Sequence, residues 1–280
     1  MYMSTRIYCG WIVFCLVIMK PIVKYQGGKS KELPLIKELM PKDFDRIVEP
    51  FCGGAAVTFG METNGILNDT NKMVTNLYRE VANYEHYREI QSVVDWLKKQ
   101  DHDTLEKQFY HSRDVINGSN DDQLIQAVSY IIVRQLCFSG MERYNAKGEF
   151  NVPFGHYKKF SCNLSEEHHN FLKECDIRNG NAIDVFDDIT DRDFIFVDPP
   201  YLERLGYTTG DGGQQLHEDL LECLKNTSAK WMIVHSDHDF YRDNYKGFNI
   251  QTKDFVYAQR FGKNKNHSGA KVQHLYITNY

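Results

Sequence analysis

The sequence predicts an α/β fold: a Rossmann-like, mostly parallel sheet with an inserted, mainly helical domain. Two short apolar runs, residues 47–48 and 194–197, have the β-branched and aromatic composition of buried parallel strands. The first run leads into a Gly53-Gly54 turn and a helical pattern, which is the strand–turn–helix order of such folds. Between the two runs, residues 71–136 carry apolar side chains at helical spacing, and these predict the inserted domain.

The composition is that of a globular protein with a substantial core. At 280 residues and 42% hydrophobic content, the chain can form one large α/β domain or a domain with an insertion. The formal net charge of -5 excludes a global attraction to nucleic acid, so any surface that binds it must be local. The seven cysteines are odd in number and contain no Cys-x-x-Cys pair. We therefore expect a cytoplasmic, non-secreted protein without disulfides or zinc.

Residues 7–19 form an apolar stretch after Arg6. About a dozen residues are too few to span a bilayer, which takes ~20. The stretch resembles a signal-peptide core, but no small-x-small cleavage site follows it. We expect residues 1–18 to be an extension outside the fold, with Met19 as the natural start. A membrane tether is the alternative.

Two motifs predict a site for a nucleotide-type cofactor. In the KYQGGK block, adjacent glycines would let the backbone approach a ligand, and Lys29 could meet a carboxylate. The EPFCGG turn is not G-x-G-x-x-G, so the fingerprint of NAD-binding proteins is absent. Asp69 ends the next short strand, at 66–68, where an acid can bond ribose hydroxyls. Alternatively, Asp69 caps the helix that begins near Asn71.

Residues 134–159 mix glycines, aromatic residues and basic residues without clear periodicity; upstream, Asp121 could cap the last helix of the insertion. The segment is locally basic, because its basic residues outnumber its two acids. The basic residues are Arg134, Arg143, Lys147, Lys158 and Lys159. Four of its side chains could wedge or stack between bases: Phe138, Met141, Tyr144 and Phe154. This composition suits a segment that contacts DNA, and it suits a solvated loop equally well.

The block Asp198-Pro199-Pro200-Tyr201 follows the apolar run at 194–197 directly. The prolines end the strand, so Asp198 and Tyr201 lie at the carboxyl edge of the sheet, where open α/β folds bind ligands. The motif is typical of amino-group methyltransferases that use S-adenosylmethionine. Asp198 and the Pro199 carbonyl would accept the N–H bonds of a weakly nucleophilic amine, and Tyr201 would stack on a flipped base. An ordinary strand end with a capping aspartate is the bland alternative.

The C-terminal part predicts further strands at 231–234 and 274–278. Two histidines and two acids lie at 235–239, but no spaced third ligand accompanies them, so we expect no metal. Residues 262–271 hold three lysines and no acid, which suits a loop that contacts phosphates.

Taken together, these blocks resemble the DNA adenine-N6 methyltransferases of the Dam/MboI/DpnII family, the D12 class, alpha group. The resemblance runs from about Lys20 to Tyr280 and rests on KYQGGK, EPFCGG, ILNDTN, RYNAKGEFNVPFGHYKK and DPPY, in the family's order. It implies a catalytic domain of residues 19–70 and 165–280 and a helical DNA target-recognition domain of residues 71–164. It also implies S-adenosylmethionine as cofactor, double-stranded DNA as partner, no metal, no membrane, and a monomer.

The resemblance carries residue roles onto this sequence. The catalytic block is Asp198, Pro199, Pro200 and Tyr201. The cofactor would contact Tyr25, Gly28, Lys29, Glu49, Pro50, Phe51, Gly53, Asp69 and Asp198, with Lys29 near its carboxylate and Asp69 at its ribose. DNA would contact Lys24, Phe138, Ser139, Met141, Arg143, Pro153 and Lys158, with Phe138 as wedge, Arg143 on a base and Pro153 on a thymine methyl.

The expected activity is site-specific methylation of adenine in a short palindrome, of the restriction-modification type. Lys24, Arg143 and Pro153 match the family pattern for GATC, with CATG as runner-up. Ser139 and Glu142 depart from that pattern, so the recognised sequence stays open, and residues 271–274 (KVQH) lack the usual acid. The alternatives are methylation of another amine (cytosine N4 in DNA, an RNA base or a glutamine side chain) and a DNA-binding protein without catalysis.

Overall fold

The computed structural model describes residues 5–8, 11–14, 19–202, 213–257 and 270–280. A seven-stranded sheet forms the frame of the molecule. Its strands run in the order β5 (Asp176–Arg178), β4 (Gly65–Asn68), β3 (Arg46–Glu49), β6 (Asp193–Val197), β7 (Lys230–Ser236), β9 (Ala270–Thr278) and β8 (Asn249–Tyr257). The first five strands are parallel, and β9 is antiparallel to both β7 and β8. The predicted Rossmann-like sheet and all its predicted strands are confirmed.

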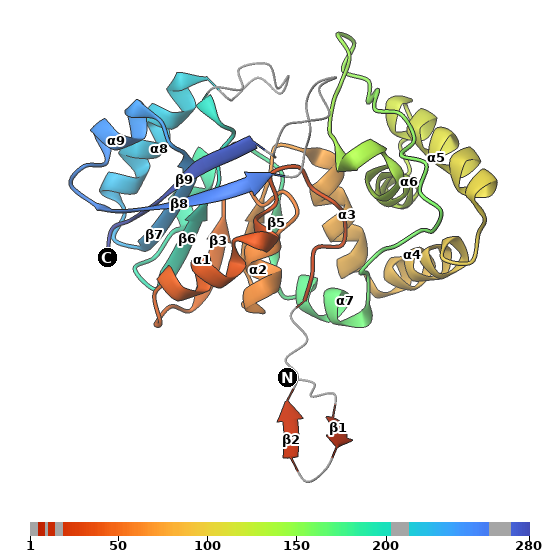
Figure 1. Cartoon of the computed structure of the whole chain (residues 1–280), viewed down its shortest axis with the longest axis horizontal. Helices are drawn as coiled ribbons and strands as arrows, with labels where there is room; N and C mark the ends of the chain where they lie inside the picture. The colour runs from red at the N-terminus through yellow and green to blue at the C-terminus, as the bar shows by residue number, and fades with distance from the viewer. Residues whose placement is uncertain (1–4, 9–10, 15–18, 203–212, 258–269) are drawn as a thin grey trace.

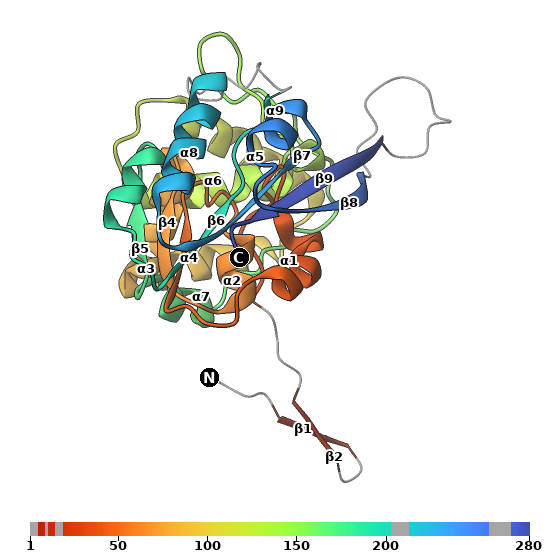
Figure 2. The ribbon, with the colours of Figure 1, turned by 90° about the vertical axis from the view of Figure 1, so that its left-hand side faces the viewer.

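Helices cover both faces of this sheet (Figure 2). One face packs against α8 (Gln214–Asn226) and α9 (Asp239–Asn244), and the other against α1 (Leu33–Leu39) and α2 (Ala56–Met61). Alternation along the strands explains the two layers, because neighbouring side chains point to opposite faces. In β6, Ile195 packs toward α8, whereas Phe194 and Phe196 pack toward α1 and α2.

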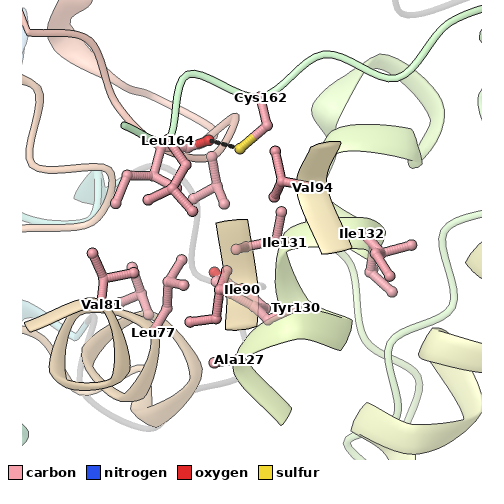
Figure 3. Packing of buried hydrophobic residues seen from close by; sticks show 14 of the residues in the cluster. Leu77, Val81, Ile90, Val94, Ala127, Tyr130, Ile131, Ile132, Cys162 and Leu164 are labelled. Atoms are coloured by element: carbon pink, nitrogen blue, oxygen red, sulfur yellow. Dashed lines mark hydrogen bonds between the residues drawn. The ribbon is translucent and has the colours of Figure 1, made fainter. Parts of the chain in front are cut away.

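The helices α3 (Lys72–Ala82), α4 (Tyr84–Leu97), α5 (His102–Asn117) and α6 (Gln123–Leu136) gather beside the sheet, with α7 (Glu166–Leu172) below them (Figure 1). Figure 3 shows their shared core, in which Leu77 and Val81 of α3 face Ile90 of α4 and Ile131 of α6. The helical prediction for residues 71–136 is confirmed. The predicted cap was wrong by one position: the side chain of Asp122, not Asp121, accepts a free backbone N–H of the first turn, from Ile125 at 3.0 Å.

Three features were not predicted. The edge strands β5 and β8 lack continuous apolar runs, since charged and polar residues interrupt them. In the N-terminal extension, β1 (Thr5–Tyr8) and β2 (Trp11–Phe14) pair with each other and with no strand of the larger sheet. The expectation that residues 1–18 lie outside the fold stays a prediction. Among the described residues, no helix has the length and apolar character to cross a membrane.

Candidate active site

Three adjacent parallel strands, β4, β3 and β6, end at one edge of the sheet. The chain leaves β3 into the Cys52–Gly54 turn, β4 into Asp69, and β6 into Asp198, so these residues meet at that edge. They line a cavity of about 630 Å³. Its lining includes all four residues of the Asp198–Tyr201 block and most of the predicted cofactor contacts: Tyr25, Gly28, Lys29, Glu49, Phe51, Gly53 and Asp69. Of the predicted cofactor residues, only Pro50 is outside this lining; its carbonyl accepts a bond from Asn68.

The glycine turn is a cradle that a side chain would fill. Gly53 has a φ of +44°, and a Cβ there would come 2.6 Å from the ring of Tyr25. The Gly53 carbonyl accepts the Tyr78 hydroxyl at 2.7 Å, and its N–H donates to Asp69 at 2.8 Å. The turn therefore presents fixed backbone to the cavity, with the Tyr25 ring against it.

Asp69 is held in place by backbone donors. It accepts the N–H of Gly53 and, at 2.9 Å, that of Asn71. The side chain that caps α3, by accepting the N–H of Met73 in its first turn, belongs to Asn71 and not to Asp69. Burial raises the pKa of Asp69 to about 6, although both backbone bonds oppose that rise. A carboxylate with these properties in a cavity is suited to bonding polar hydroxyl groups.

Lys29 and Asp198 form an ion pair in the wall of the cavity. Lys29 is 3% exposed, and its Nζ lies 2.5 Å from Asp198 Oδ2 and 3.1 Å from the Gly27 carbonyl. Burial raises the pKa of Asp198, and the positive charge of Lys29 opposes that rise. In this pair, Lys29 bonds one of the two carboxylate oxygens of Asp198, namely Oδ2.

Glu49 lies behind this pair at the end of β3. It is 3% exposed and accepts bonds from the backbone N–H of Thr58, at 2.8 Å, and from the Thr58 hydroxyl. Burial raises the pKa of Glu49 to about 7, and the negative charge of Asp198 adds to the rise. Glu49 is therefore a buried acid whose pKa lies well above that of an ordinary glutamate.

Residues 137–155 double back on themselves beside the cavity. Isolated bridges join Cys137 to Phe154 and Tyr144 to Phe150. The Phe138 N–H donates to the Pro153 carbonyl at 2.9 Å, which places these two predicted DNA contacts side by side. Phe138 is 51% exposed, and Ser139 and Pro153 are exposed beside it. An exposed phenyl ring on a solvent-facing turn is available to stack on a base.

The two predicted base-contacting cations already have partners within the chain. Arg143 donates to the side chain of Asn151 at 2.6 Å and to its carbonyl at 3.0 Å. Lys24 donates to the Gln135 carbonyl at 2.7 Å and lies 3.9 Å from the centre of the Tyr157 ring. Burial lowers the pKa of Lys24. Lys158, the predicted phosphate contact, is exposed.

Two residues expected in the DNA-contacting segment are buried. Phe154 is 1% exposed, so it belongs to the core and cannot wedge into DNA. Arg134 is fully buried on α6, where it donates to the carbonyls of Lys24, Gly140 and Met141 and lies 3.5 Å from Glu142. Arg134 therefore connects the KYQGGK block to residues 140–142. The sequence did hold a sign that Arg134 is buried, because it lies within the apolar run of α6.

Other cavity residues had no sequence signal. Asn181 and Ala182 line the cavity after β5, whose three residues include two charges. Glu142 also lines it, accepting bonds from Asn71 at 3.1 Å and Tyr144 at 2.8 Å. Within the described ranges, no cluster of histidine, cysteine and acidic side chains has the arrangement of a metal site. The predicted phosphate loop at 262–271 lies, up to residue 269, outside the described residues.

Comparison with known proteins adds an independent finding. Residues 25–259 match the family model of the D12 class N6 adenine-specific DNA methyltransferases. The chain is 34% identical to the type II methyltransferase M.CviBI of Paramecium bursaria Chlorella virus NC1A, over 94% of this chain and all of that protein. It is 30% identical to the type II methyltransferase M.MjaIII of Methanocaldococcus jannaschii, over 83% of this chain and 90% of that protein. It is also 30% identical to the DNA adenine methylase of Escherichia coli K12, over 65% of each chain.

Proposed function

Because the chain belongs to the D12 class N6 adenine-specific DNA methyltransferases, we propose that it moves a methyl group from S-adenosylmethionine to an adenine flipped out of duplex DNA. The observation that carries this proposal is the position of Asp198, Pro199 and Tyr201 in the wall of the same cavity as the Gly53 cradle and Asp69. A methyl donor and the amine that accepts the methyl group can thus meet in one cavity.

The residues present fit the cofactor. The cavity volume of about 630 Å³ is within the range of roughly 300–1,000 Å³ typical of small-molecule sites. Gly53 gives the ligand close access to backbone, Asp69 is suited to the ribose hydroxyls, and Lys29 lies within reach of a carboxylate at the Gly27-Gly28 turn. When bound, S-adenosylmethionine supplies an electrophilic methyl group on a positively charged sulfur.

The chain's own residues activate the amine. Since Lys29 bonds Oδ2 of Asp198, we assign Oδ1 and the Pro199 carbonyl as acceptors for the two N6–H bonds. Two acceptors aimed at the nitrogen stabilise the positive charge that develops on it during transfer. The Lys29 ammonium favours the ionised form of Asp198, which is the form that only accepts hydrogen bonds. Tyr201 offers a ring face for the base.

We assign DNA recognition to the segment around residues 137–155. Phe138 would stack in the duplex, Ser139 and Met141 would lie against the bases next to it, and Pro153 would face a thymine methyl. Arg143 and Lys24 would exchange their intramolecular acceptors for bases, and Lys158 would meet phosphate. GATC is the favoured site and CATG the alternative. The type II methyltransferases among the relatives support a role in restriction-modification.

We further infer a catalytic domain of residues 19–70 and 165–280, a target-recognition domain of residues 71–164, and residues 1–18 outside both. The enzyme would act as a monomer and without metal. Sedimentation of the purified chain with and without a DNA duplex tests whether it acts as a monomer. Activity in excess chelator tests whether it acts without metal.

The test of the function is incorporation of labelled methyl groups into duplex DNA, followed by nucleoside analysis. N6-methyl-2′-deoxyadenosine as the product supports the proposal. Methylcytosine, label in RNA alone, or DNA binding without incorporation would each replace it with one of the alternatives. Sequencing of the methylated DNA then identifies the site, and modified adenine outside GATC would refute that choice while leaving the enzyme class intact.

A further inference from the structure

The hydroxyl of Tyr201 is engaged by a histidine from the far end of the chain. Tyr201 Oη lies 3.1 Å from Nε2 of His274, on β9, and the two rings meet edge to face at 5.8 Å. The ring of His235, on β7, lies 4.8 Å from the Tyr201 ring on another side. Because Tyr201 also lines the cavity, these two histidines constrain the orientation of a ring that faces the substrate space.

A buried carboxylate anchors His274. Its Nδ1 lies 3.0 Å from Oε2 of Glu32, the residue that precedes α1, and the Tyr276 hydroxyl bonds the same oxygen. His274 is fully buried and Glu32 is 3% exposed. Burial opposes the ionisation of Glu32, but the bonds from His274 and Tyr276 and the charge of Lys29 outweigh it and hold the pKa of Glu32 below its usual value. Glu32 is thus a carboxylate that accepts both bonds.

These contacts fix the position of the His274 ring. Since an ionised carboxylate can only accept, Nδ1 of His274 carries a proton and donates to Glu32. The ring is thereby held with its Nε2 against the Tyr201 hydroxyl. The arrangement resembles the way a carboxylate fixes the tautomer and the ring orientation of a metal-bound histidine, although the group oriented here is a phenol.

We propose that His274 is a positioning residue for methyl transfer: anchored by Glu32, it holds the Tyr201 hydroxyl and so sets the angle of the ring on which the target adenine stacks. The proposal rests on the proposed function of Tyr201 as the stacking face.

The test is a double-mutant cycle on the full-length chain. Single-turnover methyl transfer is measured at saturating S-adenosylmethionine and DNA for the wild type, Tyr201→Phe, His274→Phe and the double variant. Each single change should lower the transfer rate about five- to tenfold, the effect of one lost hydrogen bond, with DNA affinity changed less than about twofold. The double variant should be no slower than the slower single, because both remove the same bond.

A rescue variant, His274→Gln, distinguishes loss of the Tyr201 orientation from a general loss of packing around residue 274. The amide of a glutamine can accept from Tyr201 through its oxygen and donate to Glu32 through its nitrogen, so His274→Gln should recover most of the lost rate. The matched control is His169→Phe in α7, another buried histidine, bonded to the Val81 carbonyl on the helical side of the molecule. Its transfer rate should stay within about twofold of the wild type.

The outcomes distinguish a failure of the positioning role of His274 from a failure of the proposed methyl transfer. Tyr201→Phe removes one oxygen atom and leaves the ring, so it tests the proposal even if His274→Phe fails to fold. Wild-type transfer by Tyr201→Phe, or additive losses in the double variant, would overturn the positioning role while leaving adenine methylation in place. A wild-type chain that puts no methyl group on adenine would overturn the proposed function and this proposal together.

Discussion

Replacing Glu49 with glutamine should stabilise the protein at pH 8 and change little at pH 5. Glu49 is buried at the end of β3, and both its hydrogen-bond donors come from Thr58 to one oxygen. A glutamine carbonyl can accept the same two bonds without carrying a charge. The substitution therefore removes the cost of ionising a buried acid and keeps the contacts that hold it.

The pH window follows from the direction of the shift. The pKa of Glu49 is about 7 in the folded chain against an ordinary 4.5, so the folded state binds its proton more tightly than the unfolded state does. Its contribution to stability is full below pH 4.5 and is lost as the pH rises through 7. Since one pKa unit corresponds to about 1.36 kcal/mol, the cost at pH 8 is about 3 kcal/mol. The Glu49→Gln variant should regain that amount at pH 8.

Urea unfolding at pH 5 and pH 8, with both chains measured under identical conditions, gives the two free energies of unfolding. The exposed Glu38 on α1 offers a matched control, because Glu38→Gln should change stability by less than about 0.5 kcal/mol at both pH values. If Glu49→Gln is no more stable than the wild type at pH 8, Glu49 ionises in the folded state without cost, and the argument from burial is wrong.

The remaining predictions concern recognition and the folded frame. Arg143→Ala should cost roughly 1–3 kcal/mol at its cognate base and relax discrimination there, as measured by binding to duplexes changed at single positions; equal losses on all sequences would point to a phosphate contact instead. Lys158→Ala should weaken binding to all sequences alike and flatten the salt dependence, which a salt titration measures. Arg134→Met should destabilise the chain by about 3–5 kcal/mol in urea unfolding, because it removes the positive charge beside Glu142 and the donor that bonds the carbonyls of Lys24, Gly140 and Met141. A chain that starts at Met19 should fold and retain full activity if residues 1–18 lie outside the fold, and loss of folding would place them in the core.

Sequence reasoning succeeded where the signal was local. An apolar run followed by two prolines identifies the end of β6 without any tertiary information, and the same holds for the glycine turn after β3. The rule that neighbouring parallel strands end at one edge then brings Asp69 and Asp198 to one cavity. These residues, their strands and their common wall could be predicted from the printed sequence.

It failed where the determinant was a partner distant in sequence. The charge of Arg134 suggested a DNA contact, but its side chain is buried, and the carbonyls that it bonds come from two separate places in the chain, Lys24 and the adjacent residues Gly140 and Met141. Glu32 and His274 are 242 residues apart, and no local pattern links them. The raised pKa of Asp198 depends on burial, which the residues around it do not reveal.

The most direct test of the account is methyl transfer by Asp198→Ala. Oδ1 of Asp198 is one of the two acceptors to which we assign activation of N6, and the one that carries negative charge, so the variant should incorporate no label into DNA adenine above background. Binding of S-adenosylmethionine and of duplex DNA should remain measurable by calorimetry or anisotropy, since the Gly53 cradle, Asp69 and the segment around Phe138 are unchanged. Loss of transfer with binding intact is the result we predict. Wild-type turnover by Asp198→Ala would contradict the central claim.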